Sequence, residues 1–534
     1  MKSVIKIIFF LLWVFNNGMA NVIENSYAAT YDWGNIEKVY SVCHTTDNYY
    51  IMAGYTNSFG AGNNDVLVIK LHPYLYFDWA KAFGGENNDY AYSIQQTTYG
   101  EYIVAGKTNS FGANDYNILV INLSSTGSIN WSKTINRLGD DVAYSIKQTI
   151  SNDYIIAGCS SLDTNSEVFV IKLNYNGDLI WAKTFGDLGN DEAYSIEETN
   201  DGYIVVGRTN SFSSNYDVLV IKLSHNGNLL WAKTFGLEGN DEAYSIQKTN
   251  DGGYIVVGRT NSFGPDYDVL VIKLDNNGNL LWAKIFDGLG GDDEGYSIQN
   301  TTGYEYVVVG KTHYFDTGYD VFAMKLDNMG NLVGTKIFNY SQNEQAYSIS
   351  TQDMLEYGYM IVGFTTMNTE DVLFIKTYDE LQMPPTCPWW ERAFTTTTPN
   401  FSINEVFDTI PDTFSVQIDI VTLMDTSLLT SPFVICEARV EEIGFTPTPV
   451  YLDAFSTVGK NFHIGFGIPY KARVRLEIFD IKGSLEKLLL DRNLEPGKYI
   501  MDVNLSLKEG TYFLVLKLID KKKQKEVKKL IFIK

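Results

Sequence analysis

The chain has 534 residues, of which 45% are hydrophobic, so it can form packed domains and is too apolar to be disordered throughout. Its formal net charge is −23. This acidic balance argues against nucleic acid as a partner, because phosphate binding requires a basic surface. The 36 Tyr and 30 Phe residues, against 4 Cys and 5 His, favour strands over metal chemistry, and we expect no metal and no cofactor.

The first 20 residues have the pattern of a secretory signal peptide. Lys2 and Lys6 precede a short apolar run, and small residues at the −3 and −1 sites fit cleavage after Ala20. An uncleaved anchor is the alternative. No later stretch reaches the roughly 18 apolar residues that a membrane span needs. We therefore expect no transmembrane span in the mature chain.

Residues 21–380 contain seven copies of one unit. The Tyr-Ser pairs that mark the copies are separated by 52, 52, 50, 50, 52 and 51 residues. Each copy predicts four strands, as in AYSIQKT, YIVVGRT, DVLVIKL and NLLWAKIF, with Asn-Gly or Asp-Gly turns between several of them. A regular period of this length indicates a repeat architecture. The marking tyrosines are Tyr40, Tyr92, Tyr144, Tyr194, Tyr244, Tyr296 and Tyr347.

The two ends of the array are complementary. The seventh copy lacks its fourth strand, and residues 27–34 read as a fourth strand without the other three. We therefore predict an all-β fold, a seven-bladed β-propeller of four-stranded blades, in which the N-terminal strand pairs beside residues 372–376 and closes the last blade. An open solenoid of seven sheets is the alternative.

The repeats resemble the seven-bladed β-propeller repeat proteins of bacterial and archaeal cell surfaces. The resemblance depends on the GGYIVVGRT, DVLVIKL and NDEAYSI segments and covers roughly residues 21–380. It implies the fold and brings no shared catalytic set.

Two further residue types recur at fixed positions. Glycine inside a strand usually marks a bulge or a close backbone approach, and we expect it where the next blade packs most tightly. The recurrent tryptophan of the fourth strand could form a ligand platform, but packing between blades is the favoured interpretation. The glycines are Gly54, Gly106, Gly158, Gly207, Gly258, Gly310 and Gly363. The tryptophans are Trp79, Trp131, Trp181, Trp231 and Trp282.

Residues 381–450 break the period, and their proline- and threonine-rich composition predicts a linker or a small β-module. Cys387 and Cys436 flank this region and could form a disulfide in an exported protein. Cys43 and Cys159 fall in non-adjacent repeats and are expected to be free thiols.

Residues 451–534 carry 17 Lys or Arg against 10 Asp or Glu, a net charge of +7, which marks a separate domain. Short strand signals with glycine turns predict a C-terminal β-sandwich. The segment VRLEIFD, Pro496-Gly497, GTYF from Gly510 and a final lysine-rich strand resemble the C-terminal sorting domain of the type IX secretion system. The resemblance implies export by that machinery through residues 451–534 and a secreted or outer cell-surface location. A generic capping or dimerising sandwich is the alternative.

An acid lies three residues before each marking tyrosine. If the first strands line the central channel, these carboxylates form a ring that could bind a hard cation. The alternative is that each accepts hydrogen bonds from its own loop and fixes the start of the strand. The seven acids are Glu37, Asp89, Asp141, Asp191, Asp241, Asp293 and Glu344.

The loops after the second strands and before the first strands should share one face, because alternate connections of an up-and-down sheet share an end. Five phenylalanines of these loops, beside many acids, suit a glycan or protein ligand, unless they turn inward to anchor their loops. We predict a noncatalytic binding, adhesion or structural module. The alternative is a glycan hydrolase or lyase that uses channel-mouth carboxylates. The phenylalanines are Phe59, Phe111, Phe212, Phe263 and Phe315.

Overall fold

The structure is a computed structural model. It describes residues 27–31, 33–73, 77–111, 115–137, 139–162, 165–288, 291–301, 305–313, 318–339, 343–351, 358–366, 370–378, 389–391, 395–397, 402–405, 417–420, 424–427, 433–437, 451–456, 461–468, 471–480, 485–494, 497–504, 510–519 and 524–533. All regular structure within these ranges is β-strand, and the described residues form no helix long and apolar enough to cross a membrane.

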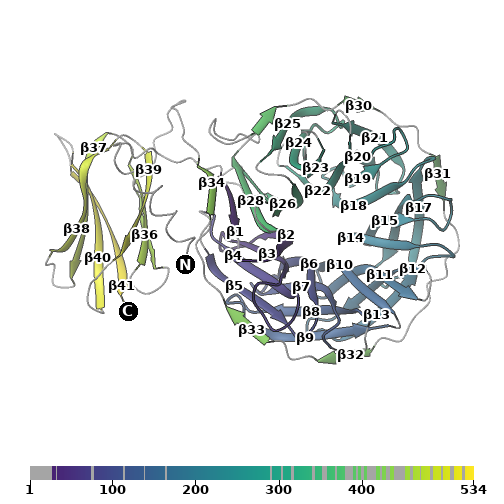
Figure 1. Ribbon diagram of the computed structural model, residues 1–534, viewed down its shortest axis with the longest axis horizontal. Helices are drawn as coiled ribbons and strands as arrows, with labels where there is room; N and C mark the ends of the chain where they lie inside the picture. The colour runs from purple at the N-terminus through teal and green to yellow at the C-terminus, as the bar shows by residue number, and fades with distance from the viewer. Residues whose placement is uncertain are drawn as a thin grey trace. The chain divides into compact units, whose positions relative to one another are not determined.

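Seven antiparallel sheets of four repeat strands follow one another along the chain, as propeller blades do, and in six of them the four strands are consecutive in sequence (Figure 1). The strands of blades 1 to 4 are β2 (Glu37–His44), β3 (Tyr50–Thr56), β4 (Asp65–Leu71), β5 (Phe77–Gly84), β6 (Asp89–Gln96), β7 (Tyr102–Thr108), β8 (Asn117–Leu123), β9 (Ile129–Asn136), β10 (Asp140–Gln148), β11 (Tyr154–Leu162), β12 (Asn165–Leu173), β13 (Leu179–Phe185), β14 (Asp191–Thr199), β15 (Gly202–Thr209), β16 (Asp217–Ser224) and β17 (Leu229–Gly236). Those of blades 5 to 7 are β18 (Asp241–Lys248), β19 (Tyr254–Thr260), β20 (Asp268–Leu274), β21 (Leu280–Asp287), β22 (Asp293–Asn300), β23 (Tyr306–Thr312), β24 (Asp320–Leu326), β25 (Leu332–Phe338), β26 (Glu344–Thr351), β27 (Gly358–Thr365), β28 (Asp371–Tyr378) and β1 (Tyr27–Tyr31).

The hydrophobic core lies between successive blades rather than at one centre. The second and third strands are apolar on both faces, and every residue of β4 and β8 is buried. In one cluster, Val66 and Val68 of blade 1 pack with Ala91, Ile94 and Val104 of blade 2. Each sheet is therefore covered on both sides, which explains the continuous apolar runs in the sequence.

The N-terminal strand β1 supplies the fourth strand of blade 7. It pairs antiparallel with β28, with Thr30 opposite Leu373, so the predicted pairing is confirmed. Blades 7 and 1 are also in contact. The backbone N–H of Glu37 donates to the carbonyl of Glu370 at 2.7 Å, and the N–H of Val42 donates to the Ser348 hydroxyl at 3.3 Å.

The recurrent tryptophans pack against the next blade. The ring of Trp79 lies over the turn glycine Gly127 of blade 2, where a Cβ atom would come within 3.0 Å of the ring. Trp231 covers Gly278 of blade 5 in the same way, at 2.4 Å. Gly127 has φ +72° and Gly278 has φ +72°, a backbone conformation that favours glycine. These contacts support packing between blades over a ligand platform.

The recurrent glycine of the second strand has a different cause from the one expected. In blade 5 the register passes from Ala243 opposite Gly258 to Ser245 opposite Val257, so Tyr244 is the extra residue of a β-bulge. A Cβ atom on Gly258 would lie 1.8 Å from the Glu242 carbonyl oxygen of the same blade. The glycine therefore accommodates the bulge within its own blade, not the neighbouring blade. The same bulge occurs in all seven blades.

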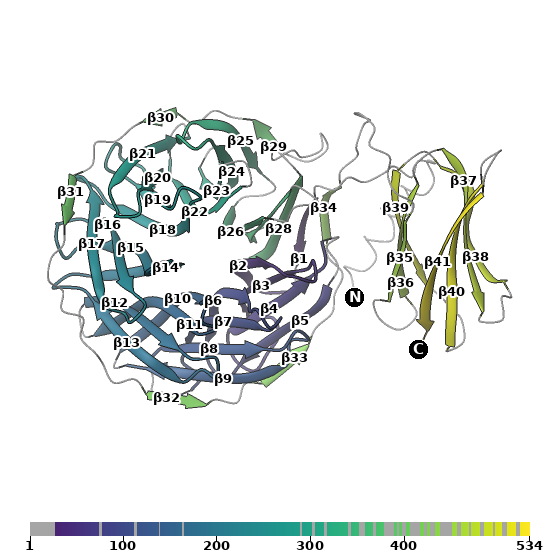
Figure 2. The same cartoon turned by 180° about the vertical axis from the view of Figure 1, so that it is seen from behind.

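The segment expected to be a linker or a small β-module contributes short strands to the blades themselves. Six strands between residues 389 and 437 lie as fifth strands on the outer edges of blades 6, 5, 4, 2, 1 and 7, in that order along the chain (Figures 1 and 2). This belt runs in the direction opposite to the repeats. Its strands are β29 (Trp389–Glu391), β30 (Thr395–Thr397), β31 (Ser402–Glu405), β32 (Gln417–Ile420), β33 (Met424–Ser427) and β34 (Phe433–Glu437).

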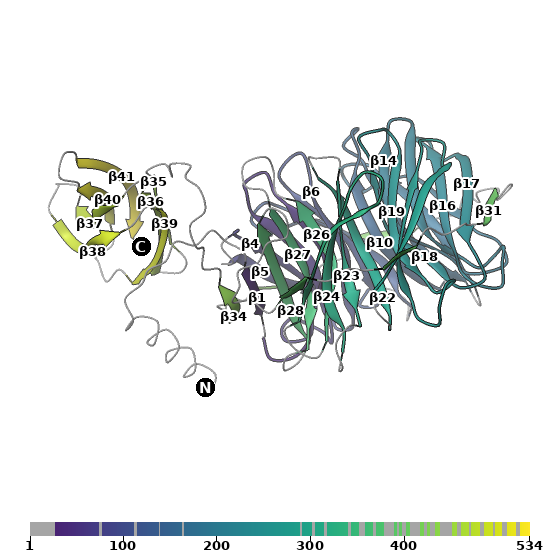
Figure 3. The same ribbon diagram turned by 90° about the horizontal axis from the view of Figure 1, so that it is seen from above.

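The C-terminal part forms a unit of its own, with a three-stranded sheet, β35-β36-β39, and a four-stranded sheet, β38-β37-β40-β41 (Figure 3). Val474, Leu476 and Ile478 of the central strand β37 are fully buried. The strands are β35 (Tyr451–Ser456), β36 (Asn461–Ile468), β37 (Ala472–Asp480), β38 (Leu485–Leu494), β39 (Gly497–Asn504), β40 (Gly510–Ile519) and β41 (Gln524–Ile533).

Candidate functional site on the innermost strands

The first strand of each blade is the innermost one (Figure 1). Its bulged tyrosine contacts the corresponding tyrosine of the two neighbouring blades. Seven tyrosine rings form a closed series, with neighbouring centroids 4.9 to 5.4 Å apart. The last contact, between Tyr347 of blade 7 and Tyr40 of blade 1, is 4.9 Å. A β-bulge re-aims a side chain, and here it turns one tyrosine per blade toward the centre.

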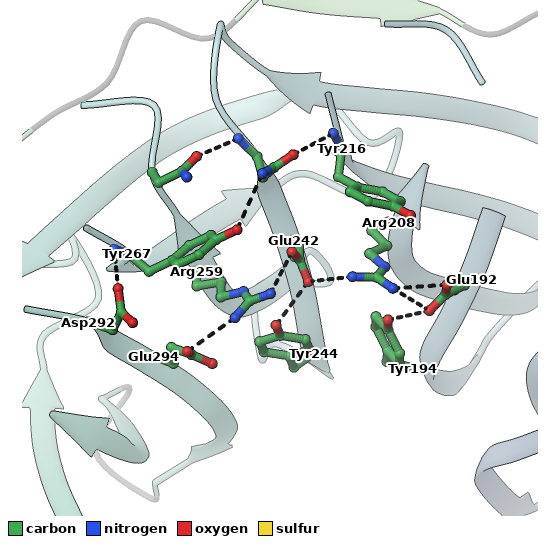
Figure 4. A network of polar contacts seen from close by, with 12 residues as sticks. Glu192, Tyr194, Arg208, Tyr216, Glu242, Tyr244, Arg259, Tyr267, Asp292 and Glu294 are labelled. Carbon is green, nitrogen blue, oxygen red and sulfur yellow. Dashed lines mark hydrogen bonds and ion pairs between the residues drawn. The ribbon is translucent and has the colours of Figure 1, made fainter. Parts of the chain in front are cut away.

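A chain of alternating charges lies beside these tyrosines in blades 4 to 6 (Figure 4). Arg208 contacts Glu192 of its own blade at 2.9 Å and Glu242 of the next at 3.2 Å. Arg259 then joins Glu242 at 2.7 Å to Glu294 at 3.1 Å. The cations come from the second strands and the acids from the first, so each arginine bonds two blades together.

Tyrosine side chains contact both the arginines and the glutamates of this network. The Arg259 guanidinium lies 4.0 Å from the centroid of Tyr267, which precedes the third strand, and 5.7 Å from that of Tyr244. The Tyr244 hydroxyl donates to Glu242 at 2.9 Å. Arg208 has the matching contact with Tyr216 at 4.3 Å. Such cation–π contacts orient a guanidinium that is also fixed by carboxylates.

The pKa values of two of these side chains, Tyr244 and Arg208, are raised above their usual values. Burial raises the pKa of Tyr244 well above its usual value, and the charge of Glu242 adds to the effect. Burial lowers the pKa of Arg208, but the neighbouring Tyr194 and Glu192 outweigh it and raise that pKa above its usual value. Both side chains therefore remain hydrogen-bond donors throughout the physiological pH range.

Blades 7, 1 and 2 carry a more aromatic version of the same positions. Lys38 pairs with Glu370 at 2.9 Å and lies 4.1 Å from the centroid of Phe364. Tyr55 meets Tyr90 of the next blade edge-on at 4.9 Å. We call these residues of all the blades the rim. In each blade the rim consists of the residue after the opening acid, the residue opposite it on the second strand, and the aromatic residue near the start of the third strand.

The seven opening acids are all buried, with at most 1% of each residue exposed. Asp191 accepts hydrogen bonds from Thr209, from the Ser211 hydroxyl at 2.7 Å and from the Asp187 N–H at 3.0 Å. This arrangement favours structural acids that fix the loops over a ring open to a cation. The acids are Glu37, Asp89, Asp141, Asp191, Asp241, Asp293 and Glu344.

Asp293 also belongs to a cluster that the sequence did not single out. Asp268, Asp287 and Asp293 each offer a carboxylate oxygen within 4.8 Å of the others. Burial and the charge of Asp287 raise the pKa of Asp268 to about 7. Burial raises the pKa of Asp293 to about 7, despite hydrogen bonds from Thr312 and Gly288. Carboxylates at such spacing are ligands that hard cations take, and this is the one cluster of that kind in the described part of the chain.

The phenylalanine loops do share a face with the loops that precede the first strands. The Asn57 side chain, one residue beyond β3, accepts a hydrogen bond from the Ile36 N–H at 2.8 Å. Phe59 meets Trp33 edge-on at 5.5 Å, and Phe111 packs on a core cluster. Phe212 and Phe263 are more open, at 38% and 44% exposed. Phe315 lies outside the described residues, so a ligand surface formed by all five phenylalanines stays a prediction.

The cysteine predictions have two outcomes. Cys43 and Cys159 are free thiols, as expected. Cys387 and the side chain of Cys436 fall outside the described residues. Burial raises the pKa of Cys159 to about 12, so this thiol is neutral at physiological pH.

The rim is the feature that the sequence argument missed, although its signal was present. The residue after each opening acid varies in character from repeat to repeat, while the residue before it is always Asp or Glu and the residue after it is always Ala, Gly or Val. In an aligned set of copies, a position that varies between charged, aromatic and apolar residues amid constant ones marks a surface rather than the core. The seven residues are Lys38, Tyr90, Val142, Glu192, Glu242, Glu294 and Gln345.

No protein-family profile and no curated protein matches the sequence. Among solved structures, Sqt1 from Chaetomium thermophilum aligns over 52% of this chain and 70% of that chain, at 13% identity and a TM-score of 0.32. The truncated trimeric ectodomain of the C. elegans fusion protein EFF-1 aligns over 91% of this chain and 94% of that chain, at 8% identity and a TM-score of 0.13. Both TM-scores are below 0.5, so neither likeness carries an argument.

Proposed function

We propose that this chain is an exported, noncatalytic binding module: a closed seven-bladed propeller that holds a protein or glycan ligand at its rim. Closure is supported by the pairing of β1 with β28 and by the contacts between blades 7 and 1. A closed ring leaves the rim as one continuous surface and protects the sheet edges from other chains.

The observation that carries the binding proposal is the arginine-and-tyrosine network of the rim. Arg208 and Arg259 keep 22% and 20% of their side chains exposed while their donors are held in place by carboxylates. Tyrosine and arginine are the residues that dominate binding energy at recognition sites, because they offer large rigid faces and several donors. A site in which these groups are fixed before a ligand arrives loses little entropy on binding.

The competing proposal is a glycan hydrolase or lyase with a pair of carboxyl groups. Asp268 and Asp293 are its best candidates, because a raised pKa suits a general acid. Asp293 is only 1% exposed, however, and its Oδ2 is engaged by the Gly288 N–H at 2.7 Å. The rim carboxylates Glu242 and Glu294 are both tied to Arg259. Neither set offers a substrate a free carboxyl pair, which supports binding without turnover.

A glycan array combined with a turnover assay on the full chain tests this proposal. We expect at least one glycan or protein ligand to be retained and recovered intact. The proposal fails if ligand is consumed and consumption stops in Asp293→Asn or Asp268→Asn, because these results would identify an enzyme.

We also propose that residues 451–534 are the export address, which the type IX secretion machinery would read, and that residues 1–20 are a signal peptide. The support is the sequence resemblance of the C-terminal segment, its net charge of +7 and its two antiparallel sheets. The location implied is secreted or at the outer cell surface.

A further inference from the structure

The charge pattern of the rim is interrupted at Lys107. In blades 4 and 5, the cation of the second strand meets the acid of its own first strand and the acid of the next blade. For Lys107, in blade 2, the residue in its own first strand is Tyr90 and the one in the next blade is Val142. Both positions that elsewhere hold a glutamate are therefore uncharged around this lysine.

Aromatic faces take the place of the missing acids. The Lys107 Nζ lies 4.4 Å from the ring centroid of Tyr116, 5.2 Å from that of Tyr90 and 5.9 Å from that of Tyr92. Within the described residues, no carboxylate lies within ion-pair distance of it. The Asp140 carboxylate attracts the Lys107 ammonium from beyond ion-pair distance. One oxygen of that carboxylate accepts a hydrogen bond from the Tyr116 N–H at 2.8 Å.

The far side of the lysine is apolar. Val142 and Cys159 of blade 3 are 8% and 7% exposed, and the Cys159 thiol is neutral. Burial lowers the pKa of Lys107, and the nearby Asp140 offsets only part of that effect. A partly buried ammonium without a counter-ion is unfavourable, because its desolvation is not compensated. An anion that entered here would supply that compensation.

Two tyrosine hydroxyls near Lys107 also lack the hydrogen bond that their counterparts make in other blades. In blades 4 to 7, the ring tyrosine donates its hydroxyl to the rim residue two positions earlier, as Tyr296 does to Glu294 at 2.7 Å. In blades 2 and 3 that rim residue is Tyr90 or Val142. The hydroxyls of Tyr92 and Tyr144 consequently have no hydrogen-bond partner among the described residues. Lys107 and these two tyrosines thus form one group of unsatisfied donors.

We propose that Lys107 is the specificity-determining residue of the rim and that it binds the carboxylate of an acidic saccharide. The Tyr90 and Tyr116 rings would take the apolar face of the sugar, and the Tyr92 and Tyr144 hydroxyls would bond its oxygens. This inference rests on the proposed binding function and names the ligand class. A uronic-acid residue combines the one carboxylate, the flat face and the several acceptors that this group requires.

A saccharide fits better than an acidic peptide for two reasons. Among the described residues of the rim, Lys107 is the one cation without a paired carboxylate, so a run of ligand carboxylates would meet repulsion from Asp140 and from the acids of blades 4 to 6. Aromatic rings flank the lysine on several sides, which favours a ring-shaped ligand over an extended backbone. The overall acidity of the chain does not prevent anion binding here, since exposed charges beyond a Debye length of about 8 Å are largely screened.

The test is titration calorimetry on the full chain with oligosaccharides that end in D-glucuronate, against matched oligosaccharides that end in D-glucose. We expect the glucuronate series to bind more tightly. Lys107→Met should weaken that binding about tenfold or more, whereas Lys107→Arg should retain most of it. Lys248→Met is the control, because Lys248 ends the first strand of blade 5 and bonds Asn200 of blade 4, away from the rim.

A second variant separates charge compensation from a folding defect. Val142→Glu restores the acid that the equivalent position carries in Glu192 and Glu242, so it should neutralise Lys107 and abolish glucuronate binding while the thermal midpoint is unchanged or higher. Equal binding of both sugar series, or wild-type affinity in Lys107→Met or Val142→Glu, would overturn the inference. So would binding of a hexaglutamate peptide with no glucuronate binding. The proposed binding function is tested separately from this inference: it would fail if no glycan or protein bound the full chain, or if the chain consumed its ligand.

Discussion

The Arg208 guanidinium lies 3.2 Å from the Glu242 carboxylate, although the two residues belong to different blades. Glu242 has only 2% of its side chain exposed and also accepts a bond from Arg259. One buried acid therefore connects the second strands of two blades through their cations. Arg208 and Arg259 connect neighbouring blades, and part of each side chain is still exposed to a ligand.

Glu242→Ala should lower the stability of the propeller by about 3 kcal/mol, because removing one partner of a buried pair leaves the other charges uncompensated. Thermal unfolding of the full chain would measure the effect as a lower midpoint of the propeller transition. Glu238→Ala is the control, since Glu238 is an exposed loop residue. Equal midpoints for the two variants would show that the network contributes little.

Gly258→Ala should destabilise the chain by about 3 kcal/mol, at the upper end of ordinary single substitutions. The added Cβ would lie 1.8 Å from the Glu242 carbonyl oxygen, so the bulge that aims Tyr244 must shift. Gly264→Ala is the control, because it is the same substitution at a site where the added Cβ would have no atom nearer than 4.0 Å. It should change the free energy of unfolding very little. Similar denaturation curves for both would contradict this account of the glycine.

The sequence predicted the repeat, the number of strands in each blade and the N-terminal partner of β28, because each depends on periodic side chains or on a missing element. It did not predict the reason for Gly258, since the bulge at Tyr244 depends on backbone register, which a hydrophobic pattern does not report. The belt was also not predicted. Strands of three to five residues such as β30, with the sequence TTT, pair through backbone groups and leave no periodic signal.

Asp287→Gly should change how stability depends on pH. The pKa values of Asp268 and Asp293, about 7 in the folded state, lie above the unfolded value of about 3.9. The folded state therefore binds more protons between these pH values, and stability should fall as the pH rises from 4 to 7. Gly84 and Gly236 occupy the position of Asp287 in blades 1 and 4, so this change restores the common residue.

Thermal midpoints between pH 4 and 8 would test this. Asp287→Gly should flatten the decline and raise the midpoint at pH 8, because one repelling charge is removed. Asp251→Gly is the control. It should not flatten the decline of the midpoint with pH, since Asp251 pairs with Lys273 at 2.9 Å and lies outside the cluster. An unchanged slope in Asp287→Gly would show that the cluster does not govern the pH response.

Deletion of residues 451–534 should leave the protein inside the cell envelope, because the export address is lost. Cell fractionation with surface proteolysis would measure it in a host that has a type IX secretion system. Deletion of the belt, residues 389–437, is the comparison and should lower stability without abolishing export. Undiminished surface exposure after removal of 451–534 would refute the sorting proposal.

Ala28→Asp should weaken the junction between blades 7 and 1. Ala28 is fully buried in a cluster with Val309 and Ile375, so a carboxylate there would be desolvated without a partner. We expect the thermal midpoint to fall and the chain to become prone to association through exposed strand edges. Light scattering during heating reports both effects, and wild-type behaviour would argue against closure by β1.

The most direct test of the account is to measure affinity and turnover for one array-identified ligand in three proteins: wild type, Tyr267→Ala at the rim and Phe263→Ala in the neighbouring loop. We predict that Tyr267→Ala weakens binding about tenfold, that Phe263→Ala leaves it nearly unchanged, and that the ligand is recovered intact from all three. Loss of affinity only in Phe263→Ala, or conversion of the ligand by the wild type, would contradict a noncatalytic binding site at the rim.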